Sequence, residues 1–344
     1  MGLLQFILIS YLGICGLSYS DLSYLESQPA IIITTEDHVQ LSLYHYPGKD
    51  LRKPPIILFS EIGTNHLLFD LPASGGLAPF LALKGRDVWV VEFRGADAAP
   101  RDWSLDELLR YDLPQALARV GVETKQKNLD LIGLGISGTI LLEYLSSGPN
   151  PDPGITKIIL INSPSSTEAA NQAVKLWAEK APDLAERDKS GLIDLKKVCQ
   201  TPAPWPTIPE TLFHLLFWGP IADEKIETEV CTTVFEPIPP GVAKQLARWV
   251  ETGILSSRDG KKIYLSNLQN IKTPALFLSG QLDNLAPPWQ AEYAFRKISS
   301  EKKKIRIFGR ANRYKKEYGH FDLILGPDAF REVFPYLFDW LKKP

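Results

Sequence analysis

Three segments of the chain carry residue types that take part in nucleophilic and acid–base catalysis. The glycine-rich segment 128–144 (NLDLIGLGISGTILLEY) contains Ser137, the segment SGQLD ends in Asp283, and the segment YGHFD contains His320. Serine can act as a nucleophile, histidine can transfer a proton, and a carboxylate can orient a histidine. Each residue also has a structural interpretation: Ser137 as a small residue at a helix start, Asp283 as a turn cap, and His320 as a hydrogen-bonded core residue.

Short apolar segments rich in Ile and Val alternate with helical patterns and must position these residues. Continuous apolarity indicates strands that are buried on both faces, and strand–helix alternation predicts an α/β fold with a mostly parallel sheet and right-handed crossovers. Strands are expected at 31–35 and 40–46 (an antiparallel opening pair), 55–59, 87–93, 129–132, 157–162, 273–279 and 303–308. Helices are expected at 77–84, 104–120, 138–146, 290–299 and 329–342.

Residues 163–272 interrupt this alternation, because they have hardly any strand pattern. A structureless loop of that length is rare in a compact domain, so the segment is predicted to be a helical cap or lid insertion. Its apolar stretch 211–218 (TLFHLLFW) favours a lid over an apolar site, with packing between insertion and core as the alternative. The core is then expected to comprise residues 29–162 and 273–344.

The segment 128–144 resembles the strand–turn–helix of the α/β-hydrolase family, in which the pattern G-x-nucleophile-x-G presents a serine or cysteine at the sheet edge. More narrowly, it is similar to the G-x-C-x-G-G-T version of polyhydroxyalkanoate synthases and related lipase-like proteins. Gly133 matches the first glycine and Ser137 the second small position, so the nucleophile position falls on Gly135, which has no side chain. Ser137 is the substitute nucleophile, although a two-residue shift along a helix turns its side chain by about 200°.

The same resemblance implies that Asp283 is the acid and His320 the base of the family's triad. The positions 135, 283 and 320 follow the family order of nucleophile, acid and histidine. The resemblance covers most of residues 30–344 and implies an α/β-hydrolase fold of lipase or esterase ancestry. Because one fold supports many activities, it does not by itself imply a reaction.

The oxyanion region departs from the family pattern. The family usually has His-Gly after the first buried strand, where this chain has Ser60-Glu61 followed by Ile62. The resemblance places the oxyanion-binding backbone in this segment and at Ile136, the residue after the nucleophile position. Losing one oxyanion donor costs about 3–4 kcal/mol in serine hydrolases, so a carboxylate that points into the region would be a serious defect.

The N-terminus predicts export. Residues 2–17 are almost uninterruptedly apolar and are followed by Ser18-Tyr-Ser20, which is typical of a signal peptide at 1–20 that is cleaved after Ser20. The alternatives are an uncleaved membrane anchor through residues 3–17 and a buried N-terminal element. Without Cys15, the chain keeps Cys199 and Cys231, which either pair in an oxidising compartment or remain free thiols.

Composition excludes several classes of protein. A chain with 44% hydrophobic and 23% charged residues is globular, and 38 Lys and Arg against 40 Asp and Glu leave no basic footprint for nucleic acid. The five histidines have no metal-ligand spacing with the cysteines, and neither a metal nor another cofactor is expected. The basic stretch 310–316 (RANRYKK) predicts a solvated loop, with contact to a membrane surface as the alternative.

Three functions remain open. The first is a catalytically impaired hydrolase that binds an apolar or acyl ligand, because the nucleophile and the oxyanion region are altered together. The second is an active lipase, esterase or acyltransferase that uses Ser137, or water or substrate activated by Asp283 and His320. The third is a partner-binding protein with an incidental pocket.

Overall fold

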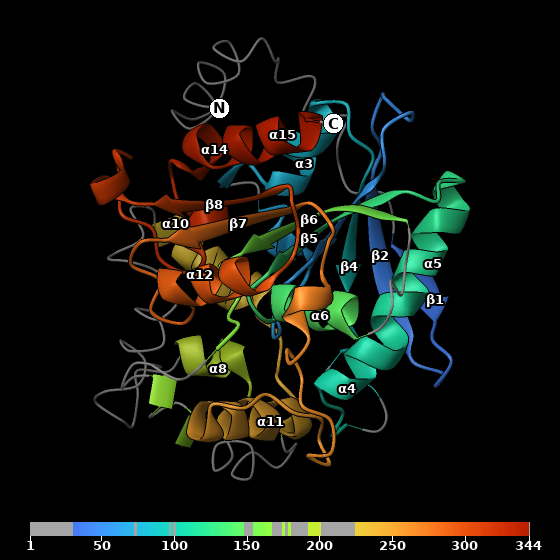
Figure 1. Cartoon of the computed structure of the whole chain (residues 1–344), viewed down its shortest axis with the longest axis vertical. Helices are drawn as coiled ribbons and strands as arrows, with labels where there is room; N and C mark the ends of the chain where they lie inside the picture. The colour runs from blue at the N-terminus through green and yellow to red at the C-terminus, as the bar shows by residue number, and fades with distance from the viewer. Residues whose placement is uncertain are drawn as a thin grey trace.

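The apolar segments predicted as strands form one sheet in the computed structural model. The structure describes residues 30–71, 74–95, 98, 101–147, 154–166, 174–175, 178–179, 192–200 and 224–343. Within these residues the sheet has eight strands, ordered β1-β2-β4-β3-β5-β6-β7-β8 (Figure 1). The strands are β1 (Ile31–Thr34), β2 (Gln40–Tyr46), β3 (Ile56–Phe59), β4 (Val88–Glu92), β5 (Leu129–Leu134), β6 (Ile155–Ile161), β7 (Ala275–Gly280) and β8 (Lys303–Phe308).

The direction of the strands confirms the predicted class of fold. β2 pairs with β1 and with β4 in antiparallel fashion, and each later pairing, from β4·β3 through β7·β8, is parallel. β5 is longer than expected, because it continues through Gly133 to Leu134. This extension brings the strand directly to the turn at Gly135.

Helices cover the sheet, and several differ from the predicted ones in their bounds. α6 begins at Ile136, two residues earlier than expected, and the predicted helix 104–120 contains a π-helical turn and continues to Thr124. The predicted helix 329–342 is divided at Val333. The helices of the core are α3 (Leu77–Leu83), α4 (Leu105–Glu107), the π-helical turn η3 (Leu108–Asp112), α5 (Leu113–Thr124), α6 (Ile136–Ser146), α12 (Pro288–Lys297), α13 (Asp322–Leu325), α14 (Ala329–Glu332) and α15 (Phe334–Lys342).

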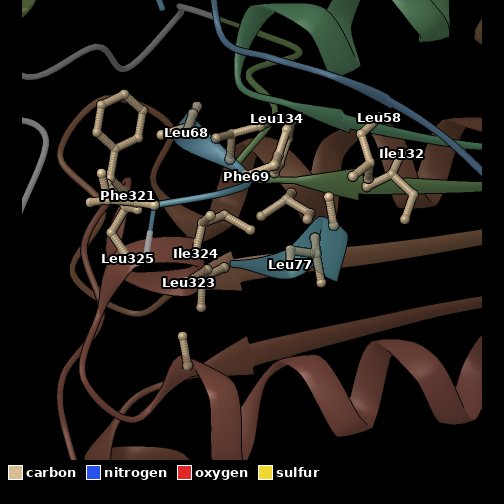
Figure 2. Packing of buried hydrophobic residues seen from close by; sticks show 14 of the residues in the cluster. Leu58, Leu68, Phe69, Leu77, Ile132, Leu134, Phe321, Leu323, Ile324 and Leu325 are labelled. Carbon is tan, nitrogen blue, oxygen red and sulfur yellow. The ribbon is translucent and has the colours of Figure 1, made fainter. Parts of the chain in front are cut away.

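Both faces of the sheet are buried, as continuous apolarity predicts. In β3, Ile56 and Leu58 belong to the hydrophobic cluster on one face, and Ile57 and Phe59 belong to the cluster on the other. Figure 2 shows part of the first cluster, in which side chains of β3 and β5 pack near those of α13. The residues labelled there are Leu58, Leu68, Phe69, Leu77, Ile132, Leu134, Phe321, Leu323, Ile324 and Leu325.

Between β6 and β7 the described residues contain helices and no strand of the sheet. These elements are α8 (Leu195–Gln200), α10 (Glu224–Glu229), the π-helical turn η4 (Val230–Val234), α11 (Pro240–Thr252) and the 3-10 helix η5 (Leu268–Asn270). In Figure 1, α8 and α11 lie below α6 and α12, at the end opposite α3, α14 and α15. An isolated bridge joins Thr64 to Phe235 and links these helices to the segment after β3.

Three predictions concern segments outside the described residues: the signal peptide at 1–20, the anchor at 3–17 and the apolar stretch 211–218. Among the helices that the structure describes, none is long and apolar enough to cross a membrane. Cys231 is disulfide-bonded and lies in η4, against which α8 packs.

Candidate functional site

The sheet brings the predicted site residues to one edge. Parallel strands end on the same side of a sheet, and in α/β folds this carboxyl edge is where ligands bind. Glu61 follows β3, Gly135 follows β5, Asp283 follows β7, and His320 follows β8. Residues that are far apart in the sequence therefore meet.

The turn between β5 and α6 is a sharp one centred on Gly135. Gly135 has φ 58° and ψ −127°, a backbone conformation that glycine adopts freely and that other residues adopt under strain. The strand and helix around it approach closely, since a Cβ at Gly133 would lie 2.7 Å from both the Cα and the N of Gly138. This geometry presents residue 135 at the tip of the turn.

Asp283 and His320 form a buried hydrogen-bonded pair. Oδ2 of Asp283 lies 2.9 Å from Nδ1 of His320, and the residues are 2% and 1% exposed. The other oxygen, Oδ1, accepts the backbone N–H groups of Leu285 and Ala286, each at 2.8 Å. The carboxylate is fixed by its own loop, so it fixes the orientation of the imidazole in turn.

The carboxylate of Glu61 fills the space beside Gly135. A Cβ added to Gly135 would overlap Oε2 of Glu61 and would lie 3.1 Å from its Oε1. Oε2 lies 3.2 Å from Nε2 of His320. The sequence left the direction of this side chain open, and the structure directs it into the site.

The same carboxylate takes the two backbone N–H groups that the family resemblance assigns to the oxyanion. The N–H of Ile62 donates to Oε1 at 2.7 Å, and the N–H of Ile136 donates to both oxygens, at 3.0 and 3.1 Å. Glu61 therefore occupies the space of a side chain at residue 135 and accepts both backbone N–H groups. A substrate carbonyl would have to displace it from both.

The surroundings of His320 favour its charged form. Burial by itself lowers the pKa of this imidazole, but the charge of Asp283 and the hydrogen bonds to Asp283 and Glu61 outweigh burial and raise the pKa to about 10. Both ring nitrogens are then donors, one to each carboxylate. Because an imidazolium cannot accept a proton, these surroundings oppose a general-base role for His320 while Glu61 remains in place.

Ser137 lies within the first turn of α6 and is completely buried. Its hydroxyl donates to the backbone carbonyl of Ser60, and Ser137 is not among the described residues that line the cavity beside His320. The hydroxyl of Ser60 is itself turned to the carbonyl of Asn65, at 3.2 Å. Neither serine contacts the Asp283–His320 pair in the described part of the chain.

An apolar cavity of about 210 Å³ opens onto this site. Glu61 lines it together with Ile136 and His320, which both hydrogen-bond to Glu61, and residues that follow β6 form much of its wall. The remaining described residues that line it are mostly apolar: Ile62, Thr64, Pro164, Val174, Ala178, Ile193, Leu195, Phe235, Ile238, Ala243, Leu246, Ala247, Trp249, Val250, Leu285, Gln290 and Phe321.

Sequence reasoning missed two parts of this site: Gln290, and the face of α11 that lines the cavity. The apolar residues of α11 recur at positions 242, 243, 246, 249 and 250, a helical spacing that could have indicated a buried face. No spacing or motif in the sequence marks Gln290 as a residue of the site. As for metals, no group of three or more His, Cys, Asp or Glu side chains that could hold an ion forms among the described residues.

Solved structures of esterases and lipases superpose on nearly the whole chain. An esterase from Exiguobacterium antarcticum matches with a TM-score of 0.62 and 15% identity, covering 91% of this chain and 99% of its own. A soluble variant of monoglyceride lipase from Saccharomyces cerevisiae matches with a TM-score of 0.62 and 15% identity, covering 92% and 96%. The chain has the α/β-hydrolase fold.

Sequence comparison connects this α/β-hydrolase fold with lipases. Lipase member K of Homo sapiens is 24% identical over 358 residues, which span 88% of this chain and 84% of the relative. Lipase lipl-1 of Caenorhabditis elegans is 32% identical over 128 residues, which span 30% of this chain and 31% of the relative. No family model matches the chain. Lipase- or esterase-like ancestry is thus supported, and the polyhydroxyalkanoate-synthase-like branch stays a prediction.

Proposed function

We propose that this chain is a lipase-related protein of the α/β-hydrolase fold that has lost ester hydrolysis and binds an apolar ligand in the cavity above Glu61 and His320. The observation that carries the proposal is the position of the Glu61 carboxylate, which overlaps the site of a Gly135 side chain and accepts the N–H groups of Ile62 and Ile136. The side chain of Glu61 therefore opposes two requirements of ester cleavage: a nucleophile at residue 135 and free backbone N–H donors for the oxyanion.

The energetic cost of this arrangement to ester cleavage is large. Hydrolysis through a tetrahedral intermediate needs backbone donors aimed at an oxygen that becomes negative, and losing one donor costs about 3–4 kcal/mol. Here both donors already serve an anion, and the negative charge of Glu61 would repel a second one. His320, which would take the proton of an attacking group, already carries a proton and hydrogen-bonds Glu61.

The cavity supports ligand binding rather than a purely structural role. Ligand sites are concave and mostly apolar, with a few polar groups that fix orientation. This cavity has that character, because its polar end at Glu61 and His320 is followed by an apolar wall that includes α11. An apolar or acyl chain fits its chemistry.

The test combines labelling with binding. The purified mature chain is exposed to a fluorophosphonate probe and to p-nitrophenyl esters of short to long acyl chains, while binding of the neutral dye Nile red is followed by fluorescence. We expect neither labelling nor turnover, together with saturable dye binding that Ala247→Phe, a substitution on the cavity wall, abolishes. Labelling of Ser137, or turnover that His320→Ala removes, would overturn the loss of catalysis. Dye binding that is insensitive to Ala247→Phe would overturn the assignment of the cavity.

We also propose that the chain is exported. The apolar segment 2–17 with Ser18-Tyr-Ser20 after it supports a signal peptide, and the disulfide at Cys231 suits an oxidising compartment. N-terminal sequencing of the protein from the culture medium or periplasm of an expressing cell is expected to begin at Asp21. Recovery of the intact N-terminus in a membrane fraction would favour the anchor through residues 3–17.

A further inference from the structure

We propose that the cavity selects amphiphiles whose head group is a cationic hydrogen-bond donor, an alkylammonium ion above all, and that it rejects fatty-acid anions. The inference rests on the proposed function and assigns a ligand class to the same cavity. It follows from two independent features of the cavity lining, the excess of acidic side chains at Glu61 and His320 and the unpaired acceptor of Gln290.

The first feature is an excess of acidic side chains. Asp283 and Glu61 each accept N–H donors from the backbone and from His320. Two acidic side chains therefore share one basic side chain, and no Lys or Arg among the described residues lines the cavity to balance the second acid. In a site shielded from water, one added cation would balance the second acid and one added anion would be repelled by it.

The second feature is an acceptor without a donor. Gln290 lines the cavity from α12 and is 1% exposed. Its Nε2 lies 3.4 Å from the carbonyl oxygen of Leu285, whereas its Oε1 is buried and has no hydrogen-bond partner in the described part of the chain. A buried acceptor without a partner is costly, and a ligand N–H or O–H group would satisfy it.

The cavity lining lacks the groups that bind a carboxylate. Glu61 and His320 are the charged residues that line it among those described, and no Lys or Arg accompanies them. The nitrogen Nε2 of His320 faces Glu61, and the N–H groups of Ile62 and Ile136 donate to Glu61 as well. The N–H donors that would bind a fatty-acid carboxylate are therefore already hydrogen-bonded to the side chain of Glu61. An ammonium head would meet the acidic side chain of Glu61 and the unpaired acceptor Oε1 of Gln290.

The test compares three ligands of equal chain length: octylamine, octanol and octanoate, each measured by isothermal titration calorimetry at pH 7 below its aggregation concentration. We expect octylamine to bind most tightly and octanoate at least about tenfold more weakly than octanol, since opposite and like charges act at short range in a shielded site. Glu61→Gln, which keeps the size of the side chain and removes its charge, should reduce the preference for octylamine over octanoate by about tenfold or more.

Two further variants test the unpaired acceptor and the apolar wall separately. Gln290→Leu removes the unpaired acceptor, so it should weaken octylamine and octanol severalfold and leave octanoate unchanged. Ala247→Phe narrows the apolar wall and should weaken all three ligands alike. The wild-type comparison needs no variant, so it tests the proposal even if Glu61→Gln fails to fold.

The outcomes distinguish the proposal from the function on which it rests. If octanoate binds as tightly as octylamine and Ala247→Phe blocks both, the ligand class is wrong and the apolar site stands. If octylamine binds best but Ala247→Phe leaves its binding unchanged, the amine is held elsewhere and the proposal is overturned. If none of the three ligands binds, the proposed function fails and the ligand class fails with it.

Discussion

At the scale of single residues, Glu61 and Gly135 form a complementary pair in space. The family pattern has a small residue where this chain has Glu61, and a nucleophile where it has Gly135. The side chain of Glu61 after β3 lies where a side chain at residue 135 after β5 would be, because those two strands are neighbours in the sheet. The two positions are compatible with each other, whereas a side chain placed at residue 135 alone would clash with Glu61.

The first prediction is that ester chemistry returns only when both positions are changed. Gly135→Ser alone places a Cβ on Oε2 of Glu61, so we expect no fluorophosphonate labelling and a loss of stability. Glu61→Gly alone frees the N–H groups of Ile62 and Ile136 but supplies no nucleophile. The double variant should label at residue 135 and cleave p-nitrophenyl esters slowly, although a serine at φ 58° carries backbone strain of about 1–3 kcal/mol.

The control for this prediction is Ser137→Ala in the double-variant background. Ser137 is buried and donates to Ser60, so its replacement should leave labelling unchanged. Labelling that disappears with Ser137→Ala would mean that the reactive serine is not the one at residue 135. A folded double variant without labelling would contradict the geometry proposed for the turn.

The second prediction concerns pH and follows from His320. Its pKa is raised from 6.5 to about 10 by Asp283 and Glu61 against the effect of burial. The folded chain therefore binds a proton more tightly than the unfolded chain, so the stabilisation is fully present below pH 6.5 and is lost as pH rises toward 10. Urea unfolding at pH 6, 7, 8 and 9 should show a falling free energy of unfolding. In His320→Gln, which lacks the titrating group, the fall should be smaller, and equal slopes for the two proteins would refute the argument.

At the scale of elements, close contact between β5 and α6 makes the sharp turn possible. Gly138 lies in the first turn of α6, where an added Cβ would overlap Oγ of Ser163, and Gly133 lies opposite it on β5. The loop after β6 thus packs against the start of α6. The turn at Gly135 depends on small residues in both elements.

The third prediction uses two glycines that both lie in helices. Gly138→Ala should destabilise the protein by about 1–3 kcal/mol through overpacking against Ser163, although alanine is the better helix former. Gly121→Ala in α5 meets one backbone oxygen, that of Gln126, at 3.3 Å, so the gain in helix propensity should leave the stability within about 1 kcal/mol of the wild type. Thermal unfolding of the two variants compares them, and equal melting temperatures would show that the contact is not tight.

At the scale of the whole molecule, helices between β6 and β7 cover the carboxyl edge of the sheet and wall the cavity. Ile193 and Ile238 form an isolated bridge in this region, and Thr64 pairs with Phe235. The disulfide at Cys231 lies in the same region, within η4. A covalent link there stabilises the part of the molecule that closes the cavity.

The fourth prediction tests that link. Of the three cysteines, Cys15 lies in the predicted signal peptide, so non-reducing peptide mapping of the mature chain should recover Cys231 joined to Cys199. Cys231→Ser should lower the free energy of unfolding by about 2–4 kcal/mol, because the cross-link restricts the unfolded chain. A reducing agent should lower the stability of the wild type to that of the variant. Free thiols in the mature chain would contradict the prediction.

Much of this protein could be predicted from the sequence by itself. Continuous apolar runs such as 55–59 and 157–162 identified strands buried on both faces, and their alternation with helices predicted the parallel sheet. Since parallel strands end on one edge, the positions of Gly135, Asp283 and His320 after three of the predicted strands were enough to expect them together. Local residue patterns and the order of the elements along the chain are therefore enough to predict the type of sheet and the edge where the site lies.

Only the tertiary structure decided what fills the site. Whether Glu61 points into solvent or into the site depends on the turn after β3, on the N–H group of Ile136 and on the imidazole of His320. The last two lie 75 and 259 residues away in the chain. Contacts between distant segments also place Gln290 and the wall that α11 contributes to the cavity. A side chain's direction is set by the sum of contacts from all neighbouring elements, and no local spacing in the sequence encodes that sum.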